Sequence, residues 1–285
     1  MTAPFTVRHD PPSGVAVVTM SGTAAGNAMG AGVWSDLPGL VTSLDADPSV
    51  RAVVLRGAGD CFSVGLDLRW YLVHYQRMRR AGEGHPAFRA RLLDEALGMQ
   101  DALVAITRSR LPFVAAVHGA CVGAALELAA ACDIRVASAD AYFSLREVRI
   151  GVIADLGALQ RLPRLIGAGA TRELALTGRD VPATEAHALG LVTRVRDSAP
   201  DLFDHAVGVA ALIAANPPQV VAGIKAVCEH TQDLPVAAGM RHTAVWNSAF
   251  LPSPELTGLL AGVLRPSNTL DAPGAPDDGA APDDG

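Results

Sequence analysis

The sequence predicts an α/β fold, because one pattern of strand, loop and helix occurs twice along the chain. The first copy runs from RAVVLRGAG at 51–59 into CFSVGLDL, and the second from FVAAVHGAC at 113–121 into VGAALELAAA. Each copy begins with an apolar run and passes through small residues into a helix-forming segment, as in a fold of repeated ββα units. A chain of 285 residues is also long enough to bury a sizeable core.

The remaining elements follow in chain order around these two copies. VAVVTMS at 15–21 is β-rich and predicts the first strand, and LVTRVR at 191–196 predicts a short late strand. Helices are predicted at 33–47, with Pro38 inside, at 70–107, interrupted by glycines and Pro86, at 160–177, at 184–190 and, with proline breaks, at 201–265.

These segments predict three parts of the chain. Residues 1–200 are expected to form the core that carries the site, and residues 201–265 a C-terminal helical subdomain. Residues 266–285 repeat the motif APDDG and lack the apolar content needed to fold, so a disordered tail is expected.

Charge and hydropathy exclude two classes of partner. The formal net charge is −6, and five aspartates after Pro266 account for most of it, which leaves a nearly neutral body without the clustered Lys and Arg of a nucleic-acid surface. Mean hydropathy is +0.27. However, charges and turn residues interrupt every stretch of about 18 residues, so neither a membrane span nor a signal peptide is expected.

The cysteines predict no metal site. Cys61, Cys121, Cys132 and Cys228 show no Cys-x-x-Cys or Cys/His ligand spacing, and small apolar residues surround them. We expect reduced core residues in a cytoplasmic protein.

Small residues at the second strand-to-helix junction predict an anion-stabilising turn. Gly119, Gly123, Ala124 and Ala125 carry almost no side chain, and the helix-forming run from Leu126 follows directly. The backbone N–H groups near Gly123 and Ala124 then lie at a helix N-terminus, where free donors and the helix dipole favour negative charge. An oxyanion hole needs such donors.

Three carboxylates follow this junction. Glu127 lies in an apolar helical stretch, Glu147 lies between Arg146 and Arg149, and Asp155 lies among Gly, Ile, Ala and Leu. Burial without a charged partner would raise their pKa values and make them acids or bases. The structural alternatives are a solvated helix face for Glu127, a surface ion pair for Glu147 and a turn or N-cap for Asp155.

These motifs resemble the crotonase superfamily, the enoyl-CoA hydratase/isomerase family, over about Val15 to Arg265. AVHGACVGAALELAAACDIRVAS is similar to the family's segment of successive glycines, Glu and Cys-Asp, FSVGLDL at 62–68 to its other oxyanion loop, and GNAM at 26–29 to its early turn. ADLGALQRLP at 154–163 resembles the Δ3,5-Δ2,4-dienoyl-CoA isomerases, because plain hydratases have Gly in place of Asp155. The resemblance implies a crotonase (ClpP-like) spiral of ββα units with a C-terminal helical subdomain that forms trimers.

The resemblance also implies roles for individual residues. The backbone N–H groups of Leu66 and Ala124 would form the oxyanion hole, and Glu127, Glu147 and Asp155 would be catalytic. The residues expected to contact substrate or CoA are Asn27, Ala28, Met29, Ser63, Val64, Gly65, Asp67, Arg69 and Gly123. Coenzyme A would belong to the substrate, so no separate cofactor is expected, and the implied partners are an acyl-CoA and further copies of this chain in a trimer or hexamer.

Three functions stay open at this point. Glu147 and Asp155 favour dienoyl-CoA isomerisation in fatty-acid β-oxidation, in which a proton leaves one end of a conjugated system and another returns at the far end. The pair of Glu127 and Glu147 would suit an enoyl-CoA hydratase. Ala124 and Ala125 replace two family glycines, which keeps a non-catalytic acyl-CoA-binding homologue as a third hypothesis.

Overall fold

The computed structural model describes residues 3–81 and 85–251, together with residues 256, 258, 260 and 261. It divides into two compact units, Met1–Gly239 and Met240–Gly285. The predicted disordered tail at 266–285 lies outside the described residues, and the predicted boundary between residues 200 and 201 stays a prediction.

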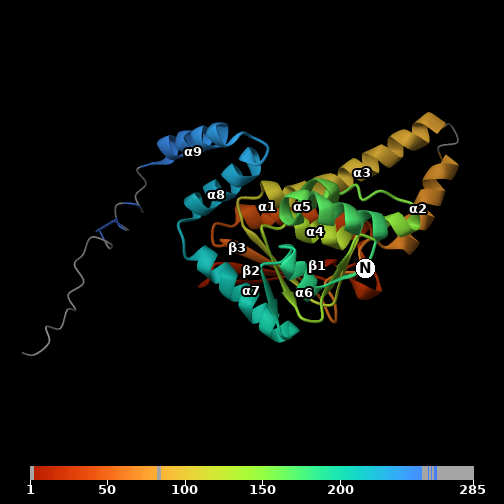
Figure 1. The fold of residues 1–285 in the computed structure, drawn as a ribbon, viewed down its shortest axis with the longest axis horizontal. Helices are drawn as coiled ribbons and strands as arrows, with labels where there is room; N and C mark the ends of the chain where they lie inside the picture. Colours follow the sequence, from red (N-terminus) through yellow and green to blue (C-terminus); the bar gives the residue numbers. More distant parts are fainter. Residues whose placement is uncertain (1–2, 82–84, 252–255, 257, 259, 262–285) are drawn as a thin grey trace, which may run out of the picture. The chain divides into compact units, whose positions relative to one another are not determined.

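A six-stranded sheet forms the centre of the first unit (Figure 1). Its order is β1 (Phe5–Asp10), β2 (Val15–Met20), β3 (Ala52–Gly57), β4 (Phe113–Val117), β6 (Ile134–Ser138) and β9 (Arg194–Arg196). β1 pairs antiparallel with β2, and the other pairs are parallel. A second sheet has the order β5 (Ala120–Val122), β7 (Tyr142–Ser144) and β8 (Val181–Pro182).

Helices cover both faces of the main sheet. α1 (Ala31–Ala46), α3 (His85–Arg108), α4 (Ala124–Ala131) and α5 (Ala158–Thr177) lie on one side, and α7 (Ala199–Ala214) packs against the other (Figure 1). The further helices are α2 (Leu68–Ala81), α6 (Ala183–Ala188), α8 (Pro218–Thr231) and α9 (Val236–Phe250), and short 3₁₀ helices span Ala25–Asn27 (η1) and Glu147–Ile150 (η2).

The parallel strands are apolar on both faces because helices bury both. Val54, Val114 and Val136 pack with Leu202 and Ala206 of α7, whereas their strand neighbours join the larger core under the other helices. Continuous apolar runs of this kind are typical of doubly covered parallel strands. The α/β fold predicted from the repeated strand, loop and helix pattern is therefore present.

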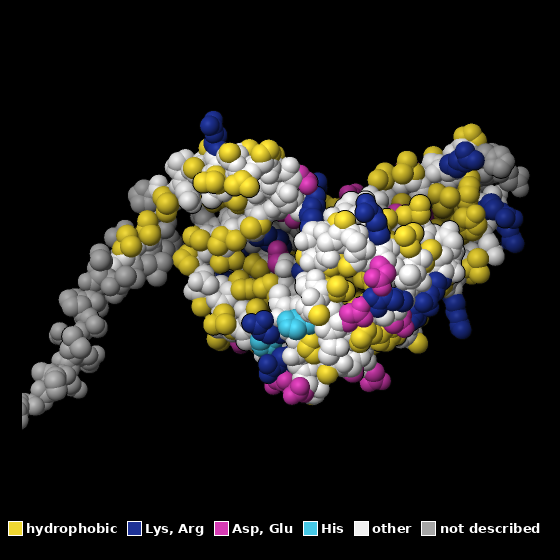
Figure 2. Space-filling view, in the orientation of Figure 1, with side chains coloured by type: hydrophobic (Ala, Val, Ile, Leu, Met, Phe, Trp, Pro, Cys, Tyr) yellow, Lys and Arg dark blue, Asp and Glu magenta, His cyan; other side chains and the backbone are white. Residues whose placement is uncertain are grey.

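Apolar side chains also remain on the surface of α7 and α8. Leu212, Val220 and Ile224 are 73%, 48% and 61% exposed. On the face shown in Figure 2, hydrophobic side chains gather over these two helices. Among the described residues no single helix is long and apolar enough to cross a membrane, although α7 and α8, bent by 106°, pass that test as a pair by length and composition alone.

Candidate active site

Backbone hydrogen bonds hold the loop at 62–67 against β5 and against the turn at 26–29. The N–H of Ser63 donates to the carbonyl of Ala120 at 2.9 Å, and the N–H of Val122 donates to the carbonyl of Ser63 at 3.2 Å. On the other side, the N–H of Met29 donates to the carbonyl of Gly65 at 2.8 Å. The two oxyanion segments and the early turn of the sequence analysis therefore form one continuous surface.

Polar side chains in these segments stabilise the loop itself. Asn27 has a φ of 55°, a left-handed conformation that Asn tolerates, and its Nδ2 donates to the carbonyls of Ala58 and Cys61 at 2.7 Å each. The Ser63 hydroxyl donates to the carbonyl of Asn27 at 2.8 Å and accepts the N–H of Gly65 at 3.0 Å. We infer that Asn27 and Ser63 position the loop, and their predicted contact with CoA stays a prediction.

The other residues predicted to contact CoA lie along the same surface. Asp67 caps α2, since its Oδ1 accepts the N–H groups of Arg69 and Trp70 at 3.1 and 3.0 Å. Ala28 and Met29 are buried, whereas Val64 and the side chain of Arg69 are exposed. Direct CoA contact by these residues stays a prediction as well.

The structure brings the two predicted oxyanion donors together. Gly65 has a φ of +89°, and a Cβ there would lie 2.3 Å from the carbonyl oxygen of Val122 and 3.4 Å from the nitrogen of Ala124. Only glycine allows this close approach of the loop to the start of α4. Within the described residues neither the N–H of Leu66 nor that of Ala124 has a hydrogen-bond acceptor. Both are thus available to a substrate oxygen.

Glu127 is almost completely buried in α4, with 1% of its surface exposed. Its Oε1 accepts the N–H groups of Leu156 and Ala158 at 3.0 Å each. Burial raises the pKa of Glu127 to about 8, with the hydrogen bond from Ala158 opposing this shift and the negative charge of Glu147 adding to it. The solvated-face alternative is therefore wrong, and the raised pKa favours the protonated form of Glu127.

Glu147 forms no ion pair with any described residue, and its neighbour Arg146 pairs with Asp180 at 2.7 Å. Its Oε2 is buried and has no hydrogen-bond partner among the described residues. A Cβ on Gly123 would lie 2.9 Å from Glu147 Oε1, so this carboxylate lies directly beside the start of α4. Burial raises its pKa, and Asp155 adds to the shift. Such an unpartnered oxygen is free to meet a substrate proton.

Asp155 is the third predicted carboxyl group, and its side chain is more exposed than those of Glu127 and Glu147. Partial loss of hydration raises its pKa. Its backbone carbonyl accepts Gln100 Nε2 at 2.7 Å, which fixes the loop to α3. Burial raises the pKa of Tyr71, and the negative charges of Glu95 and Asp155 raise it further. Tyr71 therefore lies close enough to Asp155 for their charges to interact. Neither Tyr71 nor Gln100 was predicted, because nothing in the local sequence links them to Asp155.

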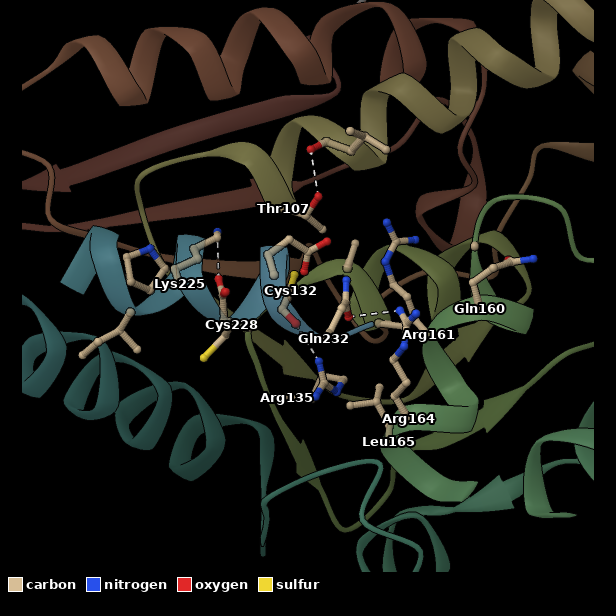
Figure 3. Close-up of a pocket in the computed structure, with 18 of the residues that line it drawn as sticks. Thr107, Cys132, Arg135, Gln160, Arg161, Arg164, Leu165, Lys225, Cys228 and Gln232 are labelled. Carbon is tan, nitrogen blue, oxygen red and sulfur yellow. Dashed lines mark hydrogen bonds and ion pairs between the residues drawn. The ribbon is translucent and has the colours of Figure 1, made fainter. Parts of the chain in front are cut away.

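A cavity of about 840 Å³ lies beyond Asp155, between residues of α3, α5, α7 and α8 (Figure 3). Asp155, Leu156 and Gly157 line one part of it, and Arg161 and Arg164 line another. In the part of the chain that the structure describes, no group of three or more His, Cys, Asp or Glu residues could hold a metal ion.

A protein-family model described as enoyl-CoA hydratase/isomerase matches residues 10–250. The chain belongs to the enoyl-CoA hydratase/isomerase family. It is 39% identical over 230 residues to the peroxisomal Δ(3,5)-Δ(2,4)-dienoyl-CoA isomerase of Arabidopsis thaliana, which covers 81% of this chain and 82% of that relative. Identity to the mitochondrial Δ(3,5)-Δ(2,4)-dienoyl-CoA isomerase of Homo sapiens is 35%, covering 81% of this chain and 70% of that relative.

Solved structures agree with this assignment. The crystal structure of a putative enoyl-CoA hydratase from Streptomyces coelicolor A3(2) matches with a TM-score of 0.82 and 29% identity, covering 91% of this chain and 90% of that one. The predicted crotonase fold, and membership of a family of enzymes, are thereby confirmed.

One prediction is wrong. The cysteine pattern suggested a cytoplasmic protein, but the two dienoyl-CoA isomerase relatives are named as peroxisomal and mitochondrial proteins. The cysteines were also expected to lie in the core, and this is correct for Cys121 and Cys132, whereas Cys61 is half-buried and Cys228 is exposed on α8.

Proposed function

We propose that this enzyme converts 3,5-dienoyl-CoA thioesters into 2,4-dienoyl-CoA thioesters. The observation that carries the proposal is the arrangement of carboxyl groups: Glu147 lies against Gly123 at the oxyanion turn, and Asp155 follows within electrostatic reach of Glu147. Proton transfer between the two ends of a diene needs one carboxyl group near the thioester and a second farther along the chain. The names of the relatives support the same reaction.

In this proposal the reaction begins at the carbon next to the thioester. The ionised Glu147 removes a proton from C2, and the electrons move into the thioester carbonyl as an extended enolate. The N–H groups of Leu66 and Ala124 hold the negative oxygen, and each donor of this kind lowers the barrier by about 3 kcal/mol. Because Ala124 keeps its backbone N–H, replacement of a family glycine leaves this donor in place.

The reaction ends at the other terminus of the conjugated system. Asp155 donates a proton to C6, the double bonds move to the 2 and 4 positions, and the number of protons on the substrate is unchanged. The raised pKa of Asp155 favours the protonated form that this step needs. Since its side chain is exposed, Asp155 can regain a proton from solvent.

Glu127 would take part as a neutral group. Three adjacent carboxylates cannot all be ionised cheaply, because like charges disfavour each other in a poorly hydrated site. With a pKa of about 8, Glu127 holds its proton at neutral pH and leaves the negative charge to Glu147. The pair of Glu127 and Glu147 would also suit water addition, so an enoyl-CoA hydratase is the alternative that the experiment must exclude.

The test is turnover of a 3,5-dienoyl-CoA and a 2-trans-enoyl-CoA side by side, with wild type, Asp155→Asn and the control Asp140→Asn. Asp140 is an exposed turn residue outside the site. We expect rapid isomerisation by wild type and the control, and a loss of about 10²-fold to 10⁴-fold in Asp155→Asn with substrate binding retained. Brisk hydration without isomerisation would show a hydratase, and binding without turnover would show a non-catalytic homologue.

We also propose that the enzyme is a homotrimer or a dimer of trimers. The exposed apolar side chains of Leu212, Val220 and Ile224 on α7 and α8 support this proposal, because such patches are typical of interfaces (Figure 2). Analytical ultracentrifugation at micromolar concentration should show a species of at least three chains. A stable monomer would contradict the proposal.

A further inference from the structure

The turn at 155–158 separates the carboxyl groups from the cavity. On one side, the N–H groups of Leu156 and Ala158 both donate to Glu127 Oε1 at 3.0 Å. On the other side, Leu156 and Gly157 line the cavity. Because both donors bind the same oxygen, Oε2 is the Glu127 oxygen without a donor among the described residues, and the orientation of the turn decides where it lies.

Arg161 contacts this turn from the cavity side. Its Nη1 donates to the carbonyl of Leu156 at 3.3 Å, and its backbone N–H donates to the carbonyl of Gly157 at 2.9 Å. A Cβ on Gly157 would lie only 2.0 Å from Arg161 Nη1, and Gly157 has a φ of +111°. The guanidinium therefore occupies the space that any other side chain at 157 would fill, which is a specific reason for glycine there.

The surroundings of Arg161 leave its charge available to the turn. It is partly buried in the cavity wall, and no carboxylate forms a direct ion pair with it among the described residues. The charged groups that act on it are Glu229 of α8, Glu127 of α4 and Arg164 one turn farther along α5. Arg164 donates instead to Gln232 (Figure 3) and also to Asp233. Two arginines on one helix thus have different tasks.

We propose that Arg161 is a positioning residue that holds the 155–158 turn in the orientation at which its two N–H groups bind Glu127. The predicted effect of Arg161 on turnover rests on the proposed function, whereas its structural role does not. Without the guanidinium, the Leu156 carbonyl loses its donor and Gly157 is free to rotate, so the donors move away from Glu127. A displacement of about 1 Å in a site of this kind costs about tenfold to a hundredfold in rate.

Loss of Arg161 should also change the ionisation of Glu127. The N–H groups of Leu156 and Ala158 lower the pKa of Glu127, and the charge of Arg161 interacts with Glu127. Removing the cation and moving the two donors away should therefore raise the pKa of Glu127 above its value of about 8. The other charged groups that face Glu127 are Glu147 of η2 and Asp155, and both stay in place in an Arg161 variant. The change can therefore be assigned to the turn and its arginine.

The kinetic experiment compares Arg161→Ala and Arg161→Lys with the matched control Arg164→Ala in the full chain. We expect kcat for dienoyl-CoA isomerisation to fall about tenfold to a hundredfold in Arg161→Ala, with KM changed less than threefold. Arg161→Lys keeps the charge and should recover part of the loss. Millimolar guanidinium chloride should also restore part of the activity of Arg161→Ala, since the adjacent cavity of about 840 Å³ admits the ion. Arg164→Ala should behave as wild type.

A spectroscopic measurement tests the inference without any substrate. Infrared difference spectra between about pH 6 and pH 10 report the protonated carboxyl group of Glu127, identified by its absence in Glu127→Gln. We expect its midpoint to rise by about one pH unit in Arg161→Ala and to stay unchanged in Arg164→Ala.

Unchanged kcat and an unchanged midpoint in Arg161→Ala would overturn the proposal, as would equal effects in both arginine variants. If wild type does not isomerise dienes, the proposed function fails, but the infrared midpoint still decides the role of Arg161. If Arg161→Ala does not fold, the test uses Arg161→Lys instead. A lysine variant with the wild-type infrared midpoint and the wild-type kcat would then show that Arg161 serves folding alone.

Discussion

Replacement of Glu127 by Gln should stabilise the folded enzyme, and more so as the pH rises. Glu127 is 1% exposed, and its pKa of about 8 lies above the ordinary 4.5. Between these values the folded state holds a proton that the unfolded state has lost, so the free energy of unfolding falls as pH rises through this window. Gln has the same shape and no charge, and its amide oxygen can still accept the N–H groups of Leu156 and Ala158.

The expected size follows from the shift. One pKa unit corresponds to about 1.4 kcal/mol, so the wild-type penalty is below about 1 kcal/mol at about pH 5 and reaches about 3 kcal/mol at about pH 7. In Glu127→Gln this penalty is absent, and about 3 kcal/mol corresponds to a Tm higher by roughly 5–10 °C at neutral pH.

Thermal unfolding followed by circular dichroism at about pH 5 and pH 7 measures this difference. The control is Asp140→Asn, which removes an exposed carboxylate outside the site. We expect the control to follow the wild-type pH dependence and Glu127→Gln to flatten it. A lower Tm in Glu127→Gln at neutral pH, or a stabilisation that does not grow with pH, would refute the argument that burial keeps this carboxyl group neutral.

Three further predictions follow from the same structure. Asn27→Ala should destabilise the enzyme by about 2–3 kcal/mol, because three carbonyls lose their donor and alanine disfavours a φ of 55°. Asn27→Gly should lose only the hydrogen bonds, so thermal melts of both variants separate the two causes, and equal melts would contradict the backbone argument. Gly123→Ala should lower kcat at least tenfold, because its Cβ would lie 2.9 Å from Glu147 Oε1 and displace that carboxyl group, and because alanine disfavours the φ of 57° at this position. Unchanged turnover would show that other contacts place Glu147. Deletion of residues 268–285 should leave Tm and kcat unchanged, given the composition of that segment, and a Tm lower by several degrees would show that it is packed.

The sequence predicted the structure best at positions where neighbouring residues alone explain why a residue type is present. Small residues before Leu126 predicted a strand-to-helix turn with free N–H groups, and the structure has this turn at Gly123 and Ala124. The apolar surroundings of Glu127 suggested burial and a raised pKa, with a solvated helix face as the alternative, and the structure has the buried form. In both cases the cause lies in neighbouring residues, so it can be read without knowing the tertiary contacts.

The parts that could not be predicted depend on contacts between distant segments. Arg146 pairs with Asp180 rather than with its neighbour Glu147, and no local pattern shows that choice. The same is true of Gln100, which binds the carbonyl of Asp155 from α3. Asn27 matches the family's early turn, but only the structure shows that its amide bridges two carbonyls of the loop at 58–61.

Placement of the charge links the fold to the proposed reaction. A base near the thioester and an acid at the far end must exist in opposite protonation states, although both belong to the same residue class. Burial raises the pKa of both groups, and the two differ in access: the exposed side chain of Asp155 can exchange its proton with solvent, whereas one oxygen of Glu147 is buried without a hydrogen-bond partner among the described residues. Glu127, neutral and fixed by two backbone donors, keeps a second negative charge out of the site until about pH 8. An ionised Glu127 would disfavour the anionic enolate that forms in the same site, so isomerisation should slow above that pH even though the base itself remains available.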